Sequence, residues 1–255
     1  MLLVIDVGNT NTVMGIYDGS KLVIDWRIRT ERNTTADEFY VLTTSLFAGN
    51  NIRPGDITRT IISSVVPPMV NILDAFCLKY LAHQPIWVDA RSAASMPILY
   101  SNPDEVGADR IVNAVAAFHK YRTSLIIIDF GTATTFDAIS EKGEYLGGAI
   151  SPGIMISAEA LFIKASKLPR VDIFTPPGKV IGTDTANSIK AGIIYGYAGL
   201  VDGIVRRMKT EMSLSPRVIS TGGLAVTMQR VTETIEKVEN NLTLEGLRII
   251  SNTLC

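Results

Sequence analysis

The sequence contains few of the residues that build disulfide frameworks and metal centres. Its 255 residues include two cysteines and two histidines, which excludes a disulfide-stabilised scaffold and a zinc centre made of Cys and His. Charge of one sign is also lacking, because 24 Lys and Arg nearly balance 25 Asp and Glu to give a formal charge of -1. The chain therefore has no overall field for nucleic acid or an anionic membrane, and any anionic ligand must be held by local groups.

Long hydrophobic runs are absent as well. The longest are strand-like segments such as Leu125–Ile128, far shorter than the roughly 20 residues of a membrane-spanning helix. The apolar run at the N-terminus meets Asp6 after four residues and has no basic segment before it, so it does not resemble a signal peptide. We expect a cytoplasmic protein that binds neither nucleic acid nor membrane.

Several widespread catalytic motifs are missing too. The chain has no Gly-x4-Gly-Lys-Ser/Thr loop, no Gly-x-Gly-x-x-Gly, no His-Glu-x-x-His and no Gly-x-Ser-x-Gly. These absences argue against a P-loop nucleotidase, a dinucleotide-binding dehydrogenase, a zinc protease and an α/β-hydrolase.

What the sequence does contain is an internal repeat. Residues 2–10 are LLVIDVGNT, and residues 125–134 are LIIIDFGTAT. In each copy, four aliphatic residues typical of a fully buried strand precede an Asp, one apolar residue and a Gly that permits a turn. The two acids, Asp6 and Asp129, lie about half a chain apart, which indicates a duplicated fold.

Each copy continues as a predicted β-meander, over 12–26 and 134–150, and then alternates helices with strands. A helix predicted at 105–121 joins the two halves. With 47% hydrophobic and 19% charged residues the chain is globular, and its length suits two domains. We predict an α/β protein with an N-terminal half at 1–113 and a C-terminal half at 114–255.

Small polar residues follow the acid in both copies. In 6–12 (DVGNTNT) the acid can anchor Mg²⁺ directly or through water, Gly8 lets backbone N–H groups approach phosphate oxygens, and the Asn and Thr side chains can donate to them. The structural alternative is a strand that ends in an Asx-type turn. The second copy, 129–135 (DFGTATT), favours phosphate binding, because two such acids on paired strands would face one cleft.

A third segment, 218–225 (VISTGGLA), leads from a predicted strand into a glycine pair. Such a pair leaves room for a flat nucleoside and can open a helix N-terminus to phosphate. By itself the segment is explained equally well as an ordinary turn between a strand and a helix.

In order and in residue type, these three segments resemble the two phosphate motifs and the adenosine motif of the actin, sugar-kinase and heat-shock-chaperone ATPase superfamily. Within it, the chain resembles the bacterial type III pantothenate kinases over nearly its full length, most clearly at 6–11, 107–110 (GADR), 129–134 and 241–247 (NLTLEGL). The resemblance implies a duplicated actin-like (ribonuclease H-like) fold, with two α/β halves around an ATP cleft.

The family resemblance also implies a reaction. This is the ATP-dependent phosphorylation of pantothenate to 4'-phosphopantothenate, the first step of coenzyme A biosynthesis, with Mg²⁺ and a monovalent cation, K⁺ or NH₄⁺. By resemblance, Asp109 is the general base, Asp129 holds the monovalent cation, and Asp6 meets the magnesium that arrives with ATP. The residues matched to ATP binding are Asp6, Val7, Gly8, Asn9, Thr10, Asn11, Thr12, Val13 and Thr132. The residues matched to pantothenate binding are Tyr100, Gly107, Ala108, Asp109, Arg110 and Thr185.

The resemblance further implies a homodimer in which Thr185 reaches the substrate of the neighbouring subunit. Here Thr183 and Asp184 stand where the family pattern leads us to expect Lys or Arg followed by Asn. The helix predicted at 184–212 carries four glycines spaced 4, 3 and 4 residues apart, on one face. That face can pack within the chain or against a second subunit.

The residue types at Asp109 and Arg110 allow two interpretations. A carboxylate at the start of a helix can accept the proton of an attacking hydroxyl, and the adjacent guanidinium can bind a carboxylate or an amide carbonyl. Sequence alone favours the second interpretation, a solvated helix N-terminus that the acidic side chain stabilises. The family resemblance reverses that order.

Two other functions stay open from the sequence. An actin-like ATPase that drives assembly or conformational change needs the ATP motifs but not Asp109 and Arg110. A catalytically idle transcriptional accessory protein can share the fold, although the intact acids at positions 6, 109 and 129 argue against it.

Overall fold

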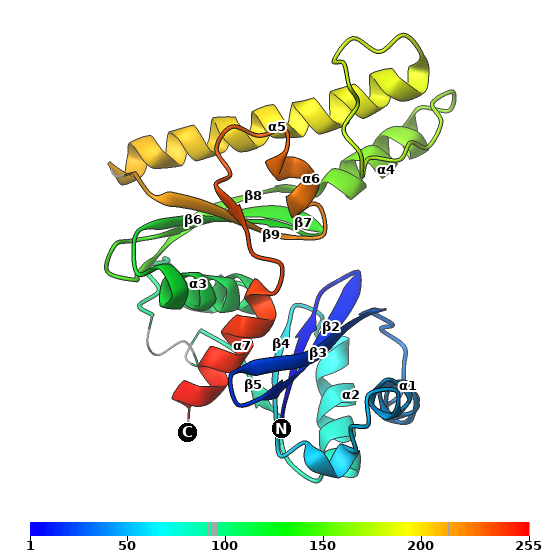
Figure 1. The fold of residues 1–255 in the computed structure, drawn as a ribbon, viewed down its shortest axis with the longest axis vertical. Coiled ribbons are helices and arrows are strands. Elements are labelled where there is room, and N and C mark those ends of the chain that lie inside the picture. The colour runs from blue at the N-terminus through cyan, green and yellow to red at the C-terminus, as the bar shows by residue number, and fades with distance from the viewer. Residues whose placement is uncertain (91, 93–95, 214, 255) are drawn as a thin grey trace. The chain divides into compact units, whose positions relative to one another are not determined.

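Two five-stranded mixed sheets form the framework of the computed structural model, which describes all residues except 91, 93–95, 214 and 255 (Figure 1). The first sheet has the strand order β3-β2-β1-β4-β5, and the second has the order β10-β9-β6-β7-β8. The strands of the first are β1 (Leu2–Val7), β2 (Asn11–Asp18), β3 (Lys21–Arg29), β4 (Arg59–Ser64) and β5 (Ile86–Trp87). Those of the second are β6 (Leu125–Phe130), β7 (Ala133–Ile139), β8 (Tyr145–Pro152), β9 (Arg217–Gly222) and β10 (Lys237–Val238).

The two sheets have the same topology. In each, the first three strands form an antiparallel meander, and the two later strands run parallel beside the first. The central strands β1 and β6 are the two copies of the repeat seen in the sequence. The prediction of a duplicated α/β fold is therefore confirmed.

The chain divides into two compact units. Unit 1 comprises residues 1–97, 101–116 and 242–255, and unit 2 comprises 98–100 and 117–241. The halves expected from the sequence share most of their residues with these units, but 242–255 groups with unit 1. The helices are α1 (Ala36–Ala48), α2 (Pro68–Phe76), α3 (Ala108–Tyr121), α4 (Ile154–Lys164), α5 (Thr185–Met212), α6 (Ala225–Gln229) and α7 (Leu242–Thr253). Helix α2 runs on into a π-helical turn at Cys77–Leu81, and 3₁₀ turns lie at Pro54–Asp56 and Pro103–Glu105.

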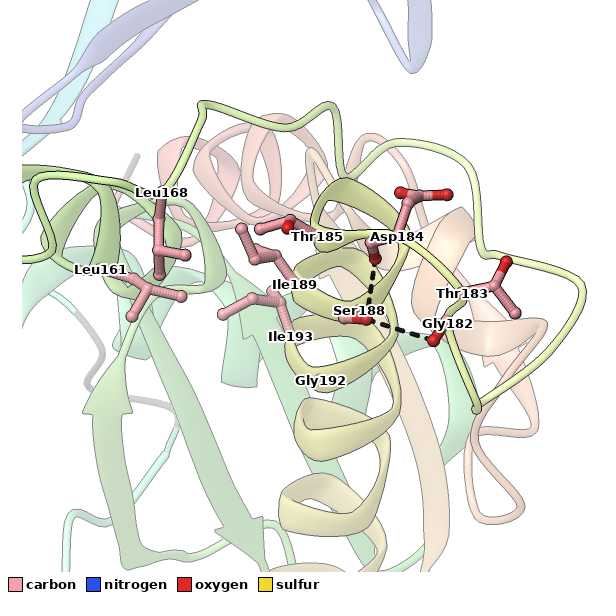
Figure 2. Close-up of a pocket in the computed structure, with 10 residues that line it drawn as sticks. All are labelled: Leu161, Leu168, Gly182, Thr183, Asp184, Thr185, Ser188, Ile189, Gly192 and Ile193. Carbon is pink, nitrogen blue, oxygen red and sulfur yellow. Dashed lines mark hydrogen bonds between the residues drawn. The ribbon is translucent and has the colours of Figure 1, made fainter.

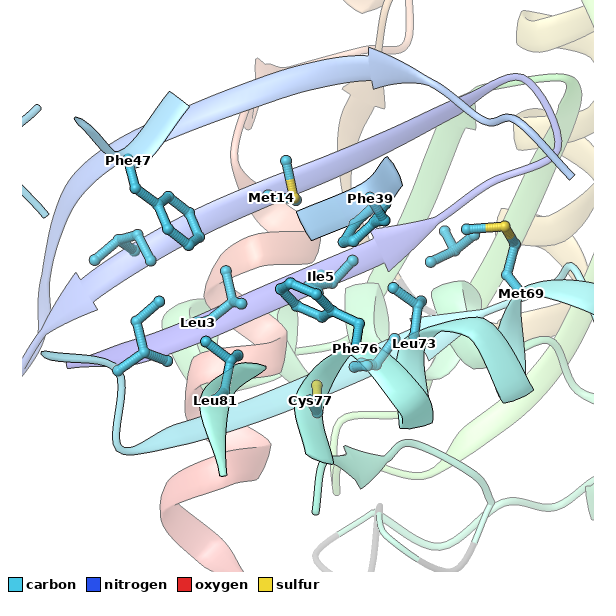
Figure 3. Packing of buried hydrophobic residues seen from close by; sticks show 14 of the residues in the cluster. Leu3, Ile5, Met14, Phe39, Phe47, Met69, Leu73, Phe76, Cys77 and Leu81 are labelled. Carbon is cyan, nitrogen blue, oxygen red and sulfur yellow. The ribbon is translucent and has the colours of Figure 1, made fainter. Parts of the chain in front are cut away.

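The core of unit 1 lies between its sheet and the pair α1 and α2. Figure 3 shows Leu3 and Ile5 of β1 facing Phe39 of α1 and Phe76 of α2, whose rings meet edge to face at 5.0 Å. The thiol of Cys77 belongs to the same core, where burial raises its pKa to about 12. Cys77 is therefore a packing residue, as its apolar surroundings in the sequence suggest. Cys255 lies outside the described residues.

Helix α7 covers the other face of this sheet and contacts β1, β2 and β4 (Figure 1). Because both faces are covered, β1 is apolar on both sides, and Leu3 and Val4 are each fully buried. Helix α7 also comes very close to α3. A Cβ atom at Gly246 would stand 2.2 Å from the carbonyl oxygen of Val112, so this approach requires glycine.

In unit 2 the long helix α5 packs on the sheet with one face only. Its Ile194, Val201 and Val205 join Ile126 and Val218 of the sheet in one buried cluster. The glycine face points elsewhere: a Cβ at Gly192, Gly196 or Gly199 would have no atom of the described residues within 4 Å outside the helix backbone itself. Close packing within the chain, one of the two explanations that the sequence allows for these glycines, is therefore wrong.

Within the described residues, no helix combines the length and the apolar character needed to cross a membrane.

Candidate active site

The first predicted phosphate motif is a tight turn after β1. Gly8 donates its backbone N–H to the carbonyl oxygen of Asn11 over 3.0 Å, which closes the turn between β1 and β2. Below the turn, the hydroxyl of Thr30 donates to the Gly8 carbonyl oxygen at 2.7 Å and lies 2.9 Å from that of Thr12. Thr12 and Thr30 are both buried. The buried hydroxyl pair thus fixes the turn from beneath.

The residues at the tip of this turn remain accessible. Asn9 and Thr10 are exposed, and Asn11 is half-buried. Arg32 reaches back to the turn and donates to the side-chain oxygen of Asn9 at 2.9 Å. The turn therefore presents polar groups and a cation to solvent while its backbone is held in place, which suits an anionic ligand.

Asp6 lies just before the turn, in the register between Val13 of β2 and Ser63 of β4. The Ser63 hydroxyl donates to the Asp6 Oδ1 atom at 2.5 Å. Burial is the largest influence on this carboxyl and raises its pKa to about 7, while the hydrogen bond from Ser63 lowers it. The charge of Asp109 also raises the pKa of Asp6, and that of Arg27 lowers it. Asp6 and Asp109 thus interact electrostatically within unit 1.

Asp109 stands in the first turn of α3, as the sequence predicts. It is half-buried, and its Oδ1 atom accepts the backbone N–H of Arg110 at 2.8 Å. Burial raises the pKa of this carboxyl, while the hydrogen bond from Arg110 lowers it. A Cβ at Gly107 would stand 2.7 Å from the same Oδ1 atom, so glycine there leaves the carboxylate its space. Arg110 itself is 7% exposed, which makes it a buried cation next to the acid.

Unit 2 repeats the first motif with a turn that is one residue shorter. Asp129 is the penultimate residue of β6 and lies in the register between Thr135 of β7 and Thr221 of β9. The N–H of Gly131 donates to the Ala133 carbonyl oxygen at 3.1 Å, which closes the equivalent turn. Asp129 is half-buried. Thr221 therefore occupies the place in unit 2 that Ser63 has in unit 1.

Thr132 is exposed at the tip of the second turn, and the start of α4 fixes that turn. The Gly153 N–H donates to the Thr132 carbonyl oxygen at 3.1 Å, and a Cβ at Gly153 would stand only 2.2 Å from that oxygen. Only glycine permits so close an approach between the N-terminus of α4 and the turn.

The first glycine of the pair in the predicted adenosine motif lies against the second acid. Gly222 has a φ of +93°, a backbone conformation that favours glycine. A Cβ at this position would stand 2.6 Å from the Oδ1 atom of Asp129. The third motif and the second acid thus form one local structure in unit 2.

Thr185 lines an open pocket of about 650 Å³ at the start of α5. Figure 2 shows Leu161 and Leu168 on one side of this pocket and Thr185 and Ile189 on the other. The helix begins there because Asp184 is its N-cap, with a side chain that accepts the N–H of Asn187 at 2.9 Å. The departure from the family pattern at Asp184 therefore has a structural explanation.

Tyr100 belongs to unit 2, where its ring packs against Tyr145 with 6.5 Å between the ring centroids. The structure thus divides the predicted residues between the units. Those in unit 1 are Asp6, Val7, Gly8, Asn9, Thr10, Asn11, Thr12, Val13, Gly107, Ala108, Asp109 and Arg110, and those in unit 2 are Tyr100, Asp129, Thr132 and Thr185.

Some residues of this site do not stand out in the sequence. Ser63 flanks Asp6 through strand pairing, and Arg27 lies on the same sheet face as Asp6, two strands away. Thr221 belongs to the predicted adenosine motif, but its place beside Asp129 appears only after β6 and β9 pair. Aligning the strands that follow each motif would reveal Ser63 and Thr221. Among the residues that the structure describes, no group of three or more His, Cys, Asp or Glu side chains could hold a metal ion.

Comparisons with known proteins identify relatives along the whole chain. The family described as "Type III pantothenate kinase" matches residues 2–207. The type III pantothenate kinase of Desulfatibacillum aliphaticivorans is 69% identical over 250 residues, which cover 98% of this chain and 97% of that protein. That of Geobacter sulfurreducens is 58% identical and covers 98% of both chains.

Solved structures show the fold at low sequence identity. A putative Baf family transcriptional activator from Campylobacter jejuni has a TM-score of 0.62 at 17% identity and covers 99% of this chain and 98% of its own. A putative 2-dehydro-3-deoxygalactonokinase from Sinorhizobium meliloti has a TM-score of 0.61 at 12% identity, with 100% and 99% covered. Both likenesses concern the fold alone.

The raised pKa of Asp6 leads to a prediction about stability in the absence of nucleotide. The pKa of Asp6 is about 7 in the folded protein and about 4 in the unfolded chain. The folded state therefore binds this proton more tightly, and the free energy of unfolding of the natural protein falls as the pH rises between these two values. Asparagine cannot titrate. Urea unfolding should therefore show Asp6→Asn gaining stability relative to the natural protein as the pH rises from about 4 to about 7.

Asp18→Asn, at the exposed last residue of β2, serves as the matched control. If the free energies of unfolding of Asp6→Asn and the natural protein follow parallel pH curves, the environment assigned to Asp6 is wrong.

Proposed function

The chain belongs to the type III pantothenate kinase family, and from this premise we propose how its residues carry out the reaction. As a pantothenate kinase it uses ATP and acts in the first step of coenzyme A biosynthesis. The observation that carries the proposal is the pair of acids in unit 1, Asp6 beside the phosphate turn and Asp109 close enough to influence its charge. Phosphoryl transfer needs one group at the phosphates and one at the attacking hydroxyl.

Asp109 is the general base in this proposal. The primary hydroxyl of pantothenate attacks the γ-phosphorus of ATP, its proton passes to the Asp109 carboxylate, and the bond from phosphorus to the bridging oxygen of ADP breaks. Burial raises the pKa of Asp109, which makes its carboxylate a better proton acceptor than a solvated one. The glycine at 107 keeps the side of this carboxylate open.

The first turn receives the phosphates, with Mg²⁺ beside them. Backbone and side-chain groups of Gly8, Asn9, Thr10 and Asn11 line the accessible tip of the turn. The Asp6 carboxylate and the phosphate oxygens are the hard oxygen ligands that Mg²⁺ prefers. A divalent cation there also favours the ionised form of Asp6, which burial disfavours.

Asp129 is proposed to hold the monovalent cation. Its Oδ1 atom lies over Gly222, in a space that any side chain at that position would fill. Thr132, at the tip of the neighbouring turn, is assigned a contact with the nucleotide. A cation at Asp129 reduces the repulsion between this carboxylate and the phosphates of ATP.

Arg110 is proposed to bind the carboxylate of pantothenate, since a buried guanidinium is a strong partner for a planar anion. Gly107 and Ala108 border the same helix start. Tyr100, a residue of unit 2, is assigned a contact with pantothenate.

The protein is proposed to act as a cytoplasmic homodimer in which Thr185 contacts the substrate bound by the other subunit. Two features of unit 2 support an interface there. The glycine face of α5 lacks a packing partner in the described chain, and large apolar side chains are exposed around α4 and the segment before α5. The most exposed of these are Ile150, Ile163, Phe174, Val180 and Ile181.

The role of the Asp109 carboxylate as base can be tested by substitution. Asp109→Asn should lower turnover on the order of 10²-fold or more, because the amide cannot accept the hydroxyl proton, while ATP binding persists. Pantothenate-dependent ADP formation and equilibrium nucleotide binding measure the two effects. Asp104→Asn, in the exposed 3₁₀ turn just before α3, should behave like the natural protein. If Asp109→Asn turns over at nearly the natural rate, Asp109 is not the general base.

The cation assignment predicts a salt-specific activity. With Na⁺ or Tris as the only monovalent cation, pantothenate phosphorylation should collapse, and K⁺ or NH₄⁺ should restore it, because the charge of Asp129 near the phosphates needs a bound counterion. Asp129→Asn should lose this response to K⁺. Full activity of the natural protein in Tris alone contradicts the assignment.

The shared site predicts complementation between two impaired variants. Asp109→Asn and Thr185→Ala subunits, each poorly active alone, should regain up to about half the normal activity per mixed dimer, because one of the two sites then has both natural residues. Activity is measured after subunit exchange, with each variant exchanged against itself as the control. A fully active monomer, or proven exchange without recovery, would exclude a shared site.

A further inference from the structure

A fully buried carboxylate in unit 2 has no part in the proposed chemistry. Asp137 lies in the middle of β7 and is 0% exposed. Its Oδ1 atom accepts a hydrogen bond of 2.6 Å from the hydroxyl of Tyr145, which is also 0% exposed, and its Oδ2 atom lies 3.3 Å from the Thr135 hydroxyl. Burying an acid is costly unless it is hydrogen-bonded, so this arrangement holds the Tyr145 side chain in one orientation.

Tyr145 in turn holds the segment that ends in Tyr100. Ile98 forms a parallel bridge with Tyr145 at the start of the edge strand β8, and the N–H of Leu99 donates to the Tyr145 carbonyl oxygen at 2.8 Å. The Tyr100 ring then leans on the Tyr145 ring at an interplanar angle of 59°. These contacts bring residues 98–100 into unit 2, although the residues on either side of them belong to unit 1.

The space for the Tyr100 ring also depends on β8. Gly147 has a φ of +119°, and a Cβ there would touch Cδ2 and Cε2 of Tyr100 at 3.6 Å. That distance is an ordinary contact, so β8 runs directly beside the Tyr100 ring. The backbone pairing and the Tyr145 ring therefore position a side chain that is itself partly exposed.

We propose that Tyr145, fixed by its buried hydrogen bond to Asp137, is a positioning residue that sets the Tyr100 ring for pantothenate. The inference rests on the proposed contact between Tyr100 and the substrate. It adds two residues to the pantothenate site that touch neither substrate nor nucleotide. Their effect should appear in the KM for pantothenate, while the KM for ATP and kcat stay close to natural values.

The test compares steady-state kinetics for matched variants whose folding is checked by circular dichroism. Tyr145→Phe keeps the ring but removes the hydroxyl, and should raise the KM for pantothenate about threefold to tenfold. Asp137→Asn retains an oxygen that accepts the bond and should stay near the natural KM. Tyr121→Phe removes the hydroxyl of another tyrosine in unit 2, which donates to Glu239 instead, and should leave all constants unchanged.

A second pair of variants tests the same anchor from the other side, and decides the question if Tyr145→Phe does not fold. Leu99→Pro removes the N–H that donates to Tyr145, and Leu99→Ala keeps it; the Leu99 side chain is 56% exposed, so neither change disturbs a core. Leu99→Pro should raise the KM for pantothenate, and Leu99→Ala should not.

Tyr100→Ala separates the two possible failures. If it raises the KM for pantothenate but folded Tyr145→Phe and Leu99→Pro do not, positioning by Tyr145 is wrong and the substrate contact of Tyr100 stands. If Tyr100→Ala leaves that KM unchanged, the contact itself is wrong, and the inference falls with it.

Discussion

An acid at the end of a fully buried strand is the constraint on which the rest of the structure depends. Strand β1 lies at the centre of the sheet with helices on both faces, and its residues are therefore mostly apolar. Its penultimate residue is nevertheless an acid, Asp6. Burial resists the charge of this carboxyl, as its raised pKa shows. The Ser63 hydroxyl, the cation on β3 and the polar turn that follows all surround that one unfavourable charge, which a Mg²⁺ ion carried by a phosphate would stabilise.

The second copy meets the same constraint with related means. A hydroxyl residue stands beside the acid on the parallel neighbour strand in both units, Ser63 in one and Thr221 in the other. The two copies differ in the groups that lie against the acid. In unit 1 the start of α3 brings a second acid, Asp109, whereas in unit 2 the backbone of Gly222 lies against Asp129. The duplicated framework thus gives its two strand-end acids different surroundings, which suits the separate roles proposed for them, Asp109 as base beside the first and a cation at the second.

The elements and the motifs could be predicted from the sequence because their signals are local. The aliphatic run before each acid, the glycine turns and the helix caps are all written in adjacent residues. Contacts that depend on strand register could not be predicted in this way. Ser63 lies next to Asp6, and Tyr145 next to Asp137, only after the strands pair. For Asp109 the sequence favours solvation, while the packing around Gly107 leaves the carboxylate half-buried. The exposure of the glycine face on α5 likewise follows from which side of that helix meets the sheet.

The place of α7 affects how the chain can fold as it is synthesised. Unit 1 needs this helix to cover its sheet, and Gly246 packs it against α3, yet α7 follows all of unit 2 along the sequence. Unit 2 is thus inserted into unit 1 along the sequence, and unit 1 lacks one wall until the chain has run through all of unit 2. Until α7 emerges, the apolar face around Val4 and Gly15 is open to water or to a chaperone. Unit 1 begins before unit 2 along the sequence and is completed after it.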